Sequence, residues 1–185
     1  MVWPRASERC MMRSLELNQT EEKMRKLVLV CGFSFLSAPM ALAQGPVAVQ
    51  WNCAQPAPVN SLDAGDQPNH VFTISQVKCA ATKGEIAGVK QQAGVGTEFH
   101  EVMGTSDRFH GVYVETLANG DKITYTYKGT ATVKAGGLES ANNTWSATGG
   151  TGKFKGIKAS GTCKAVGKPD GTSTFDCSGN YSIAK

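Results

Sequence analysis

Proline, histidine and surplus charge are all scarce in this sequence. The 185 residues include 7 prolines and 3 histidines, and 19 basic residues stand against 15 acidic ones, for a net charge of +4. Nucleic-acid binding needs a denser basic surface than this, so we expect no nucleic-acid partner. The sequence also lacks a phosphate-binding glycine loop, a nucleophile elbow and a zincin motif. It therefore predicts no cofactor and no metal site, and it names no catalytic residue.

Glycine is the residue in good supply. There are 21 glycines, and 41% of the residues are hydrophobic against 18% charged, a composition typical of a folded, turn-rich β domain. From His70 onward, strand patterns alternate with glycine turns, and no helical period of useful length occurs. Gly94-Val95-Gly96 is expected to be one of these turns. The pattern predicts about eight strands, at residues 71–80, 85–89, 97–103, 109–117, 122–134, 138–148, 157–166 and 173–183.

We predict an all-β fold, in which these strands form an antiparallel meander that closes as a small barrel over residues 70–185. Closure removes exposed strand edges, and a sandwich of two sheets is the alternative. Residues 44–69 are rich in Pro, Ala, Asn and Asp, and are expected to form an irregular N-terminal arm. Its one strand candidate, residues 47–53, precedes Pro56 and Pro58.

Residues 24–43 have the pattern of a secretory signal peptide. Two basic residues precede an apolar run, and an Ala-Leu-Ala cleavage site follows. The apolar run is about ten residues long, half of the roughly twenty needed to cross a bilayer, so no integral membrane span is expected. We expect cleavage after Ala43 and a periplasmic or secreted protein. Residues 1–23 are then a leader upstream of a true start at Met24.

Cleavage leaves an even number of cysteines, which in an exported chain indicates disulfides. They are Cys53, Cys79, Cys163 and Cys177. The segment Lys168–Thr172 has the Pro-Asp-Gly pattern of a three-residue hairpin loop, and such a loop places Cys163 opposite Cys177. Cys53 is then left to pair with Cys79. Zinc binding is the alternative, but no two of these cysteines have the short spacing of a zinc motif.

Asn119-Gly120 is the clearest internal hairpin signal, because both residues tolerate the positive φ of a two-residue turn. A two-residue loop pairs residues whose numbers sum to 239. One face of this hairpin then holds Val112, Val114, Ile123, Tyr125 and Tyr127, and is expected to face the core or a cavity. Glu115 falls on the opposite, outer face.

Several aromatic side chains are candidates to line a cavity in the barrel. They are Tyr113, Tyr125, Tyr127, Trp51 and Trp145. A small barrel can enclose a small apolar or aromatic molecule, which is the one partner that the sequence indicates. The same side chains would otherwise fill the core, since the chain has few large aliphatic residues to do so.

The histidines raise the question of a metal or acid-base site. Glu98 lies two positions before His100, on the same strand face, and His110 follows on the next strand. However, Ser106-Asp107 indicates a turn between the two strands, with charged neighbours on both sides. We therefore expect Glu98 and the histidines, His70 included, to lie on the surface.

The most specific pattern in the chain lies between Trp145 and Thr162. Its central stretch resembles the Gly-Gly-Thr/Ser-Gly-x-Phe-x-Gly motif of the allene oxide cyclase and dirigent superfamily, whose members are eight-stranded barrels. The matching residues are Gly149, Gly150, Thr151, Gly152, Phe154 and Gly156. We expect structural roles only: the first glycines end a strand, Thr151 caps a helical turn, Phe154 enters the core, and Gly156 ends the turn in a left-handed conformation.

The resemblance implies architecture more directly than function. The whole chain is similar to small exported bacterial proteins of this barrel type. The cyclases close a five-membered ring on an unsaturated fatty-acid epoxide, and dirigent proteins steer the coupling of phenolic radicals. No polar cavity residue of either family can be matched here. We predict a non-enzymatic structural or ligand-binding module. A cyclase or isomerase acting on an unsaturated lipid-like or phenolic substrate is the alternative, with Tyr125 and Tyr127 as its inward polar candidates.

Overall fold

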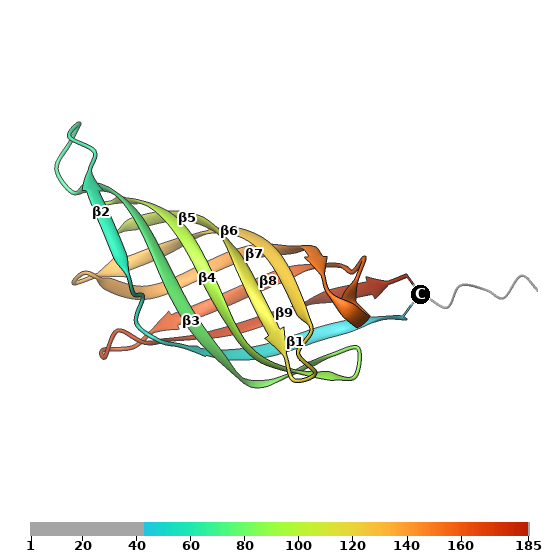
Figure 1. Cartoon of the computed structure of the whole chain (residues 1–185). Helices are drawn as coiled ribbons and strands as arrows, with labels where there is room; N and C mark the ends of the chain where they lie inside the picture. Colours follow the sequence, from blue (N-terminus) through green and yellow to red (C-terminus); the bar gives the residue numbers. More distant parts are fainter. Residues whose placement is uncertain (1–42, 185) are drawn as a thin grey trace, which may run out of the picture. The chain divides into compact units, whose positions relative to one another are not determined.

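Strands with alternating burial build the fold. The computed structural model describes residues 43–184, which contain nine strands and one short 3-10 helix (Figure 1). The strands are β1 (Ala43–Cys53), β2 (Val59–Asp63), β3 (His70–Ile86), β4 (Val89–Met103), β5 (Ser106–Leu117), β6 (Lys122–Lys134), β7 (Gly137–Gly150), β8 (Lys158–Gly167) and β9 (Ser173–Ile183), and the helix η1 is Gly152–Phe154. In this part of the chain, no helix is long and apolar enough to cross a membrane.

The strands close into an antiparallel barrel. Consecutive strands pair from β3 to β9, and β1 closes the circle by pairing with β9 on one side and β3 on the other. The extra strand β2 pairs only with β3 and projects from the barrel (Figure 1). The predicted all-β barrel of eight strands is therefore confirmed.

Two disulfides staple neighbouring strands. Cys53–Cys79 links β1 to β3, and Cys163–Cys177 links β8 to β9. In both cases the two cysteines are direct partners in the strand register. Both predicted disulfides are therefore present. The hairpin at residues 168–172, where Lys168 N–H donates to Thr172 O at 2.8 Å, sets the register that brings Cys163 opposite Cys177.

The structure contradicts the predicted irregular N-terminal arm. Ala43–Cys53 is a full barrel strand, β1, in which Val47, Val49 and Trp51 are buried and alternate with exposed residues. β2 was not predicted, because all five of its residues are exposed and it has no alternation to detect. The proposed leader and signal peptide lie outside the described residues, apart from Ala43.

Two predicted breaks between strands near the start of the barrel are also wrong: the one between residues 80 and 85, and the turn at residues 94–96. β3 continues to Ile86, and the turn that follows is Ala87-Gly88, where both residues have positive φ. The expected turn at Gly94–Gly96 lies inside β4. These glycines serve side-chain packing, since a Cβ at Gly94 would collide with the ring of Tyr113.

The hairpin at Asn119-Gly120 differs by one residue from the prediction. Leu117 N–H donates to Asp121 O at 2.9 Å, which closes a three-residue loop in which only Gly120 has a positive φ. Tyr113 is therefore opposite Tyr125, and Glu115 is opposite Ile123. A shift of one residue reverses the faces of a strand. Glu115 consequently points into the barrel.

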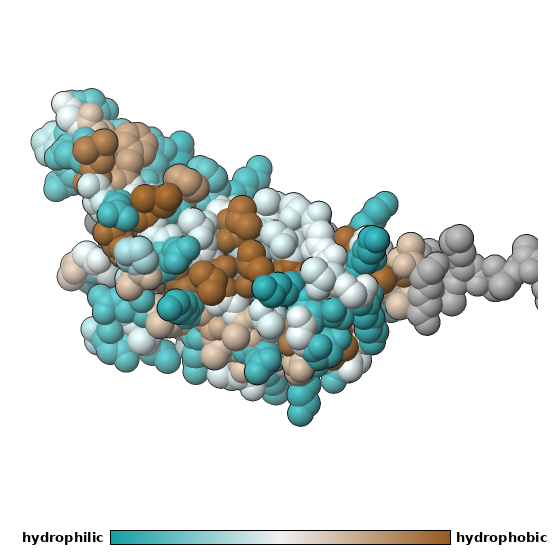
Figure 2. Space-filling view, viewed as in Figure 1, coloured by the Kyte–Doolittle hydropathy of each residue, from teal (hydrophilic) through white to brown (hydrophobic). Residues whose placement is uncertain are grey.

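The same shift places Val112 and Val114 on the outside, with 43% and 37% of their surface exposed. They join other apolar side chains on the outer face of β2 to β5: Leu62, Phe72, Ile74 and Phe99. Figure 2 shows apolar surface gathered on this side of the molecule, interrupted by hydrophilic side chains.

The segment that follows β7 forms a short plug. Phe154 is fully buried, and Gly156 has the expected left-handed conformation, with φ of 76°. Contrary to the prediction, Thr151 does not cap the helix with its side chain. Its Oγ1 instead accepts a hydrogen bond from the Lys122 N–H at 2.8 Å, so it fixes the plug to the start of β6.

Candidate functional site

The barrel encloses a cavity of about 90 Å³. Side chains from all eight barrel strands line it. Among them are six aromatic and two carboxylate groups: Trp51, Glu98, Tyr113, Glu115, Tyr125, Tyr127, Trp145 and Phe175. The five aromatic residues that the sequence indicated as candidates, Trp51, Tyr113, Tyr125, Tyr127 and Trp145, all lie on this lining. The structure thus brings them together around a space.

Glycines on β4 and β5 make room for the tyrosines. A Cβ at Gly96 would lie 2.9 Å from the Tyr127 hydroxyl, and one at Gly111 would lie 2.7 Å from the same oxygen. Tyr113 occupies the equivalent space beside Gly94. The two rings therefore occupy space that a larger residue on β4 or β5 would fill.

Glu115 is the most deeply buried charged residue of the described chain, with 1% of its surface exposed. Its Oε2 accepts a hydrogen bond from the Tyr125 hydroxyl at 2.9 Å. Burial raises the pKa of Glu115 to about 7, although hydrogen bonds from Tyr125 and Gln91 offset part of this effect. A carboxyl group with such a pKa exchanges a proton near neutral pH, as a general acid or base must.

The tyrosine hydroxyls of the cavity remain protonated. Burial raises the pKa of Tyr113, Tyr125 and Tyr127, and the nearby carboxylates Glu115 and Glu98 raise it further. At physiological pH these groups are therefore neutral, and they act as hydrogen-bond donors.

Five buried polar atoms of the cavity lining have no hydrogen-bond partner within residues 43–184: Gln91 Oε1, Tyr113 Oη, Glu115 Oε1, Asn143 Oδ1 and Trp145 Nε1. Buried polar groups in proteins are nearly always paired, because an unpaired one costs about 1–3 kcal/mol. Such a concentration of unpaired atoms around one cavity indicates a place for polar atoms from outside the chain.

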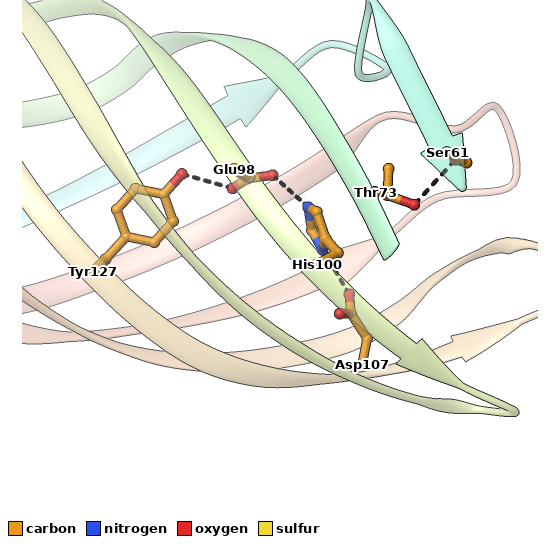
Figure 3. A network of polar contacts seen from close by, with 6 residues as sticks. All are labelled: Ser61, Thr73, Glu98, His100, Asp107 and Tyr127. Carbon is orange, nitrogen blue, oxygen red and sulfur yellow. Dashed lines mark hydrogen bonds and ion pairs between the residues drawn. The ribbon is translucent and has the colours of Figure 1, made fainter. Parts of the chain in front are cut away.

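A second polar network extends from the cavity along β4 (Figure 3). The Tyr127 hydroxyl donates to Glu98 Oε1 at 2.8 Å, and Glu98 Oε2 lies 3.3 Å from His100 Nε2. The other ring nitrogen, His100 Nδ1, lies 2.8 Å from Asp107 Oδ2. This continuous chain links the cavity lining to a histidine whose side chain is 19% exposed.

His100 is positively charged in this network. Burial alone lowers the pKa of His100, but hydrogen bonds and charge interactions with Asp107 and Glu98 outweigh it and raise the pKa to about 9. The imidazolium lies between the two carboxylates and offsets one of their two negative charges. The expected surface position of Glu98 and His100 is wrong, since both side chains are mostly buried.

The other histidines lie elsewhere. His70 is buried, with Nδ1 2.7 Å from Asp66 Oδ1, so its predicted surface position is also wrong. His110 is exposed on the outer face of β5 and stacks on Phe99 at 5.4 Å. Glu98, His100 and His110 are thus not brought together. Within the described range, no group of three or more histidine, cysteine or acidic side chains is arranged to hold a metal ion.

Sequence reasoning missed four polar residues of the interior: Gln91, Asp107, Glu115 and Asn143. Asp107 was placed in a turn, but the turn is centred on Gly104, and Asp107 is an inward residue of β5. Glu115 lies on the same face of β5 as Tyr113 and Leu117. Had the sequence been interpreted with a three-residue loop at Asn119-Gly120, the resulting register would have predicted that Glu115 points inward.

No protein-family model matches the sequence, and no curated protein matches it. Among solved structures, the chain is similar to one described as the structure of the pterocarpan synthase dirigent protein GePTS1. The two share 9% sequence identity with a TM-score of 0.48, over 84% of this chain and 99% of the other.

Proposed function

We propose that this chain is an exported protein that binds a small molecule inside its barrel. The observation that carries the proposal is the cavity, whose lining combines aromatic walls with five unpaired polar atoms. Ligand sites are typically apolar spaces with a few convergent polar groups. The two disulfides support export, because such links persist in oxidising compartments. The signal-peptide pattern of residues 24–43 supports the same route.

Native mass spectrometry of the protein purified from its own host tests this proposal. We expect a retained mass that disappears when the protein is denatured. The matched variant is Val77→Phe, since Val77 lines the cavity and a larger side chain there would fill it. This variant should fold with nearly unchanged stability and retain no ligand. If the interior is only a packed core, Val77→Phe should instead destabilise the protein by about 1–3 kcal/mol through overpacking.

A catalytic role as a cyclase or isomerase is the second candidate, and the Glu115–Tyr125 pair favours it. A carboxyl group with a pKa of about 7 beside a neutral tyrosine hydroxyl is a suitable acid-base pair, and both groups line the cavity. A closed barrel would also exclude water from a reactive substrate and hold it in one conformation.

The product ratio from a short unsaturated epoxide, small enough for a cavity of about 90 Å³, tests the catalytic role. We expect the wild-type protein to raise the fraction of ring-closed product over hydrolysed product, and Glu115→Gln and Tyr125→Phe to reduce that fraction. The surface variant Glu139→Gln serves as the control, because Glu139 is exposed on β7. An uncatalysed ratio with the wild-type protein would exclude this role for this class of substrate.

A further inference from the structure

The charged groups of the cavity lining are all acidic. They are Glu98 and Glu115, and within residues 43–184 no lysine, arginine or histidine lines the cavity. Glu98 has a basic partner in His100, 3.3 Å away, which it shares with Asp107. Glu115 forms no ion pair in the described part of the chain. Glu115 is therefore the carboxyl group of the lining that has no ion-pair partner within residues 43–184.

Most of the unpaired polar atoms of the cavity are hydrogen-bond acceptors. Three of the five are oxygens that accept hydrogen bonds: Gln91 Oε1, Glu115 Oε1 and Asn143 Oδ1. Their side chains are more than nine-tenths buried. A fourth, the Tyr113 hydroxyl, can also accept. An ammonium group offers only donors, three in a primary amine, so it is chemically complementary to this set.

Aromatic rings surround the same space. Trp51 and Tyr113 are in edge contact at 5.5 Å between ring centroids, and so are Tyr125 and Trp145. Aromatic faces attract organic cations through the ring quadrupole, an interaction of about 2 kcal/mol when the cation is desolvated. A cage of rings with one carboxylate is a typical recognition site for such cations.

We propose that the barrel cavity is a site for a small organic cation, an alkylammonium whose charged head is held by Glu115 and whose apolar body lies among the aromatic rings. This inference rests on the proposed binding function and specifies the chemical class of the ligand. The cavity volume sets the size of the ligand. At about 90 Å³, the cavity is smaller than the roughly 150 Å³ cavity that accommodates benzene, so a body of about four carbons fits better than an aromatic ring.

The pH dependence of binding follows from the titratable groups that share the cavity with Glu115. These are Glu98, which is paired with His100, and the neutral hydroxyls of Tyr113, Tyr125 and Tyr127. Since the pKa of Glu115 is about 7, the empty site is partly protonated at neutral pH. A bound ammonium favours the ionised carboxylate, so binding releases a proton and strengthens as the pH rises from 6 to 8.

Titration with n-butylamine and 1-butanol tests this proposal, because the two probes have the same shape and differ in charge. The indole N–H resonances of Trp51 and Trp145 report binding inside the barrel. At pH 8 we expect the amine to bind about tenfold more tightly than the alcohol, the advantage of a charge-assisted and cation–π contact. The amine affinity should fall at pH 6, while that of the alcohol stays unchanged.

Glu115→Gln is the critical variant and Glu139→Gln its matched control. We expect Glu115→Gln to lose the preference for the amine over 1-butanol, while the dispersed indole N–H resonances of Trp51 and Trp145 show that the variant is folded. Glu139→Gln should retain that preference. Equal or tighter binding of the alcohol by the wild type would overturn the cation proposal and leave the binding function standing. If neither probe shifts the indole resonances, the binding function itself fails for ligands of this size.

Discussion

Gly94 lies against the ring of Tyr113, and a Cβ at Gly94 would overlap the Cζ and hydroxyl oxygen of that ring. Gly94→Ala must therefore displace Tyr113 or bend β4. We expect a loss of about 1–3 kcal/mol in the free energy of unfolding, measured by chemical denaturation. The control is Gly149→Ala, since no atom lies within 4 Å of a Cβ there. It should change stability by less than about 0.5 kcal/mol. Similar losses in both variants would contradict the packing role of Gly94.

The two disulfides should each contribute measurably to stability. In the chain-entropy model, removal of Cys163–Cys177, which are 14 residues apart, costs about 3 kcal/mol. Cys53–Cys79 encloses a longer loop, with a separation of 26, and should cost slightly more. Paired Cys→Ala variants and urea denaturation measure both. Non-reducing peptide mapping should recover these two links, and four free thiols in the exported protein would refute them.

His100 should make the protein less stable at alkaline pH. The pKa of folded His100 is about 9, above its value of 6.5 in the unfolded chain. The folded state therefore binds more protons between these values, so the stabilisation is complete below pH 6.5 and is lost as the pH rises through 9. Denaturation of the wild type and His100→Gln from pH 6 to 9 measures the effect. The stability difference between the two proteins should shrink with rising pH, and a constant difference would exclude the ionised network.

Glu115 should affect stability at lower pH. Its folded pKa of about 7 is raised from 4.5, so the folded state holds an extra proton between these values. Stability due to this group is complete below pH 4.5 and is lost as the pH rises to 7. Glu115→Gln carries no titrating proton at this position. We expect the wild type to lose stability relative to this variant from pH 4.5 to 7. Parallel profiles would show that Glu115 titrates normally.

The two hairpins explain why the fold was more predictable than the site. The loops at Pro169–Gly171 and Ala118–Gly120 have the same geometry, with a glycine of positive φ in third position. Proline marked the first loop as a three-residue turn, and the strand register and the disulfide followed correctly. Asn119 left the length of the second loop ambiguous, because its Oδ1 can accept the Asp121 N–H, here at 3.1 Å, without a positive φ of its own. A one-residue error in this loop leaves the predicted barrel unchanged, but it reverses the predicted face of Glu115.

Packing against distant strands accounts for the remaining differences. Gly94 and Gly96 have the composition of a turn. They lie in a strand because they make room for the rings of Tyr113 on β5 and Tyr127 on β6. Likewise, the burial of His100 depends on Asp107, which reaches it from β5. Such contacts are set by the closed barrel and leave no local pattern in the sequence.

The position of β1 has a consequence for how the chain acquires its structure. Every residue of β1 pairs with β9, the last barrel strand in chain order, so the sheet cannot become a cylinder until β9 has been made. Contacts between such distant segments slow folding, because a long loop must be ordered first. Cys53–Cys79 joins β1 to β3 across only 26 residues, and this link can form before β9 exists. The first strand is then already anchored when β9 arrives, so the final step is the addition of one hairpin strand to an edge held in place.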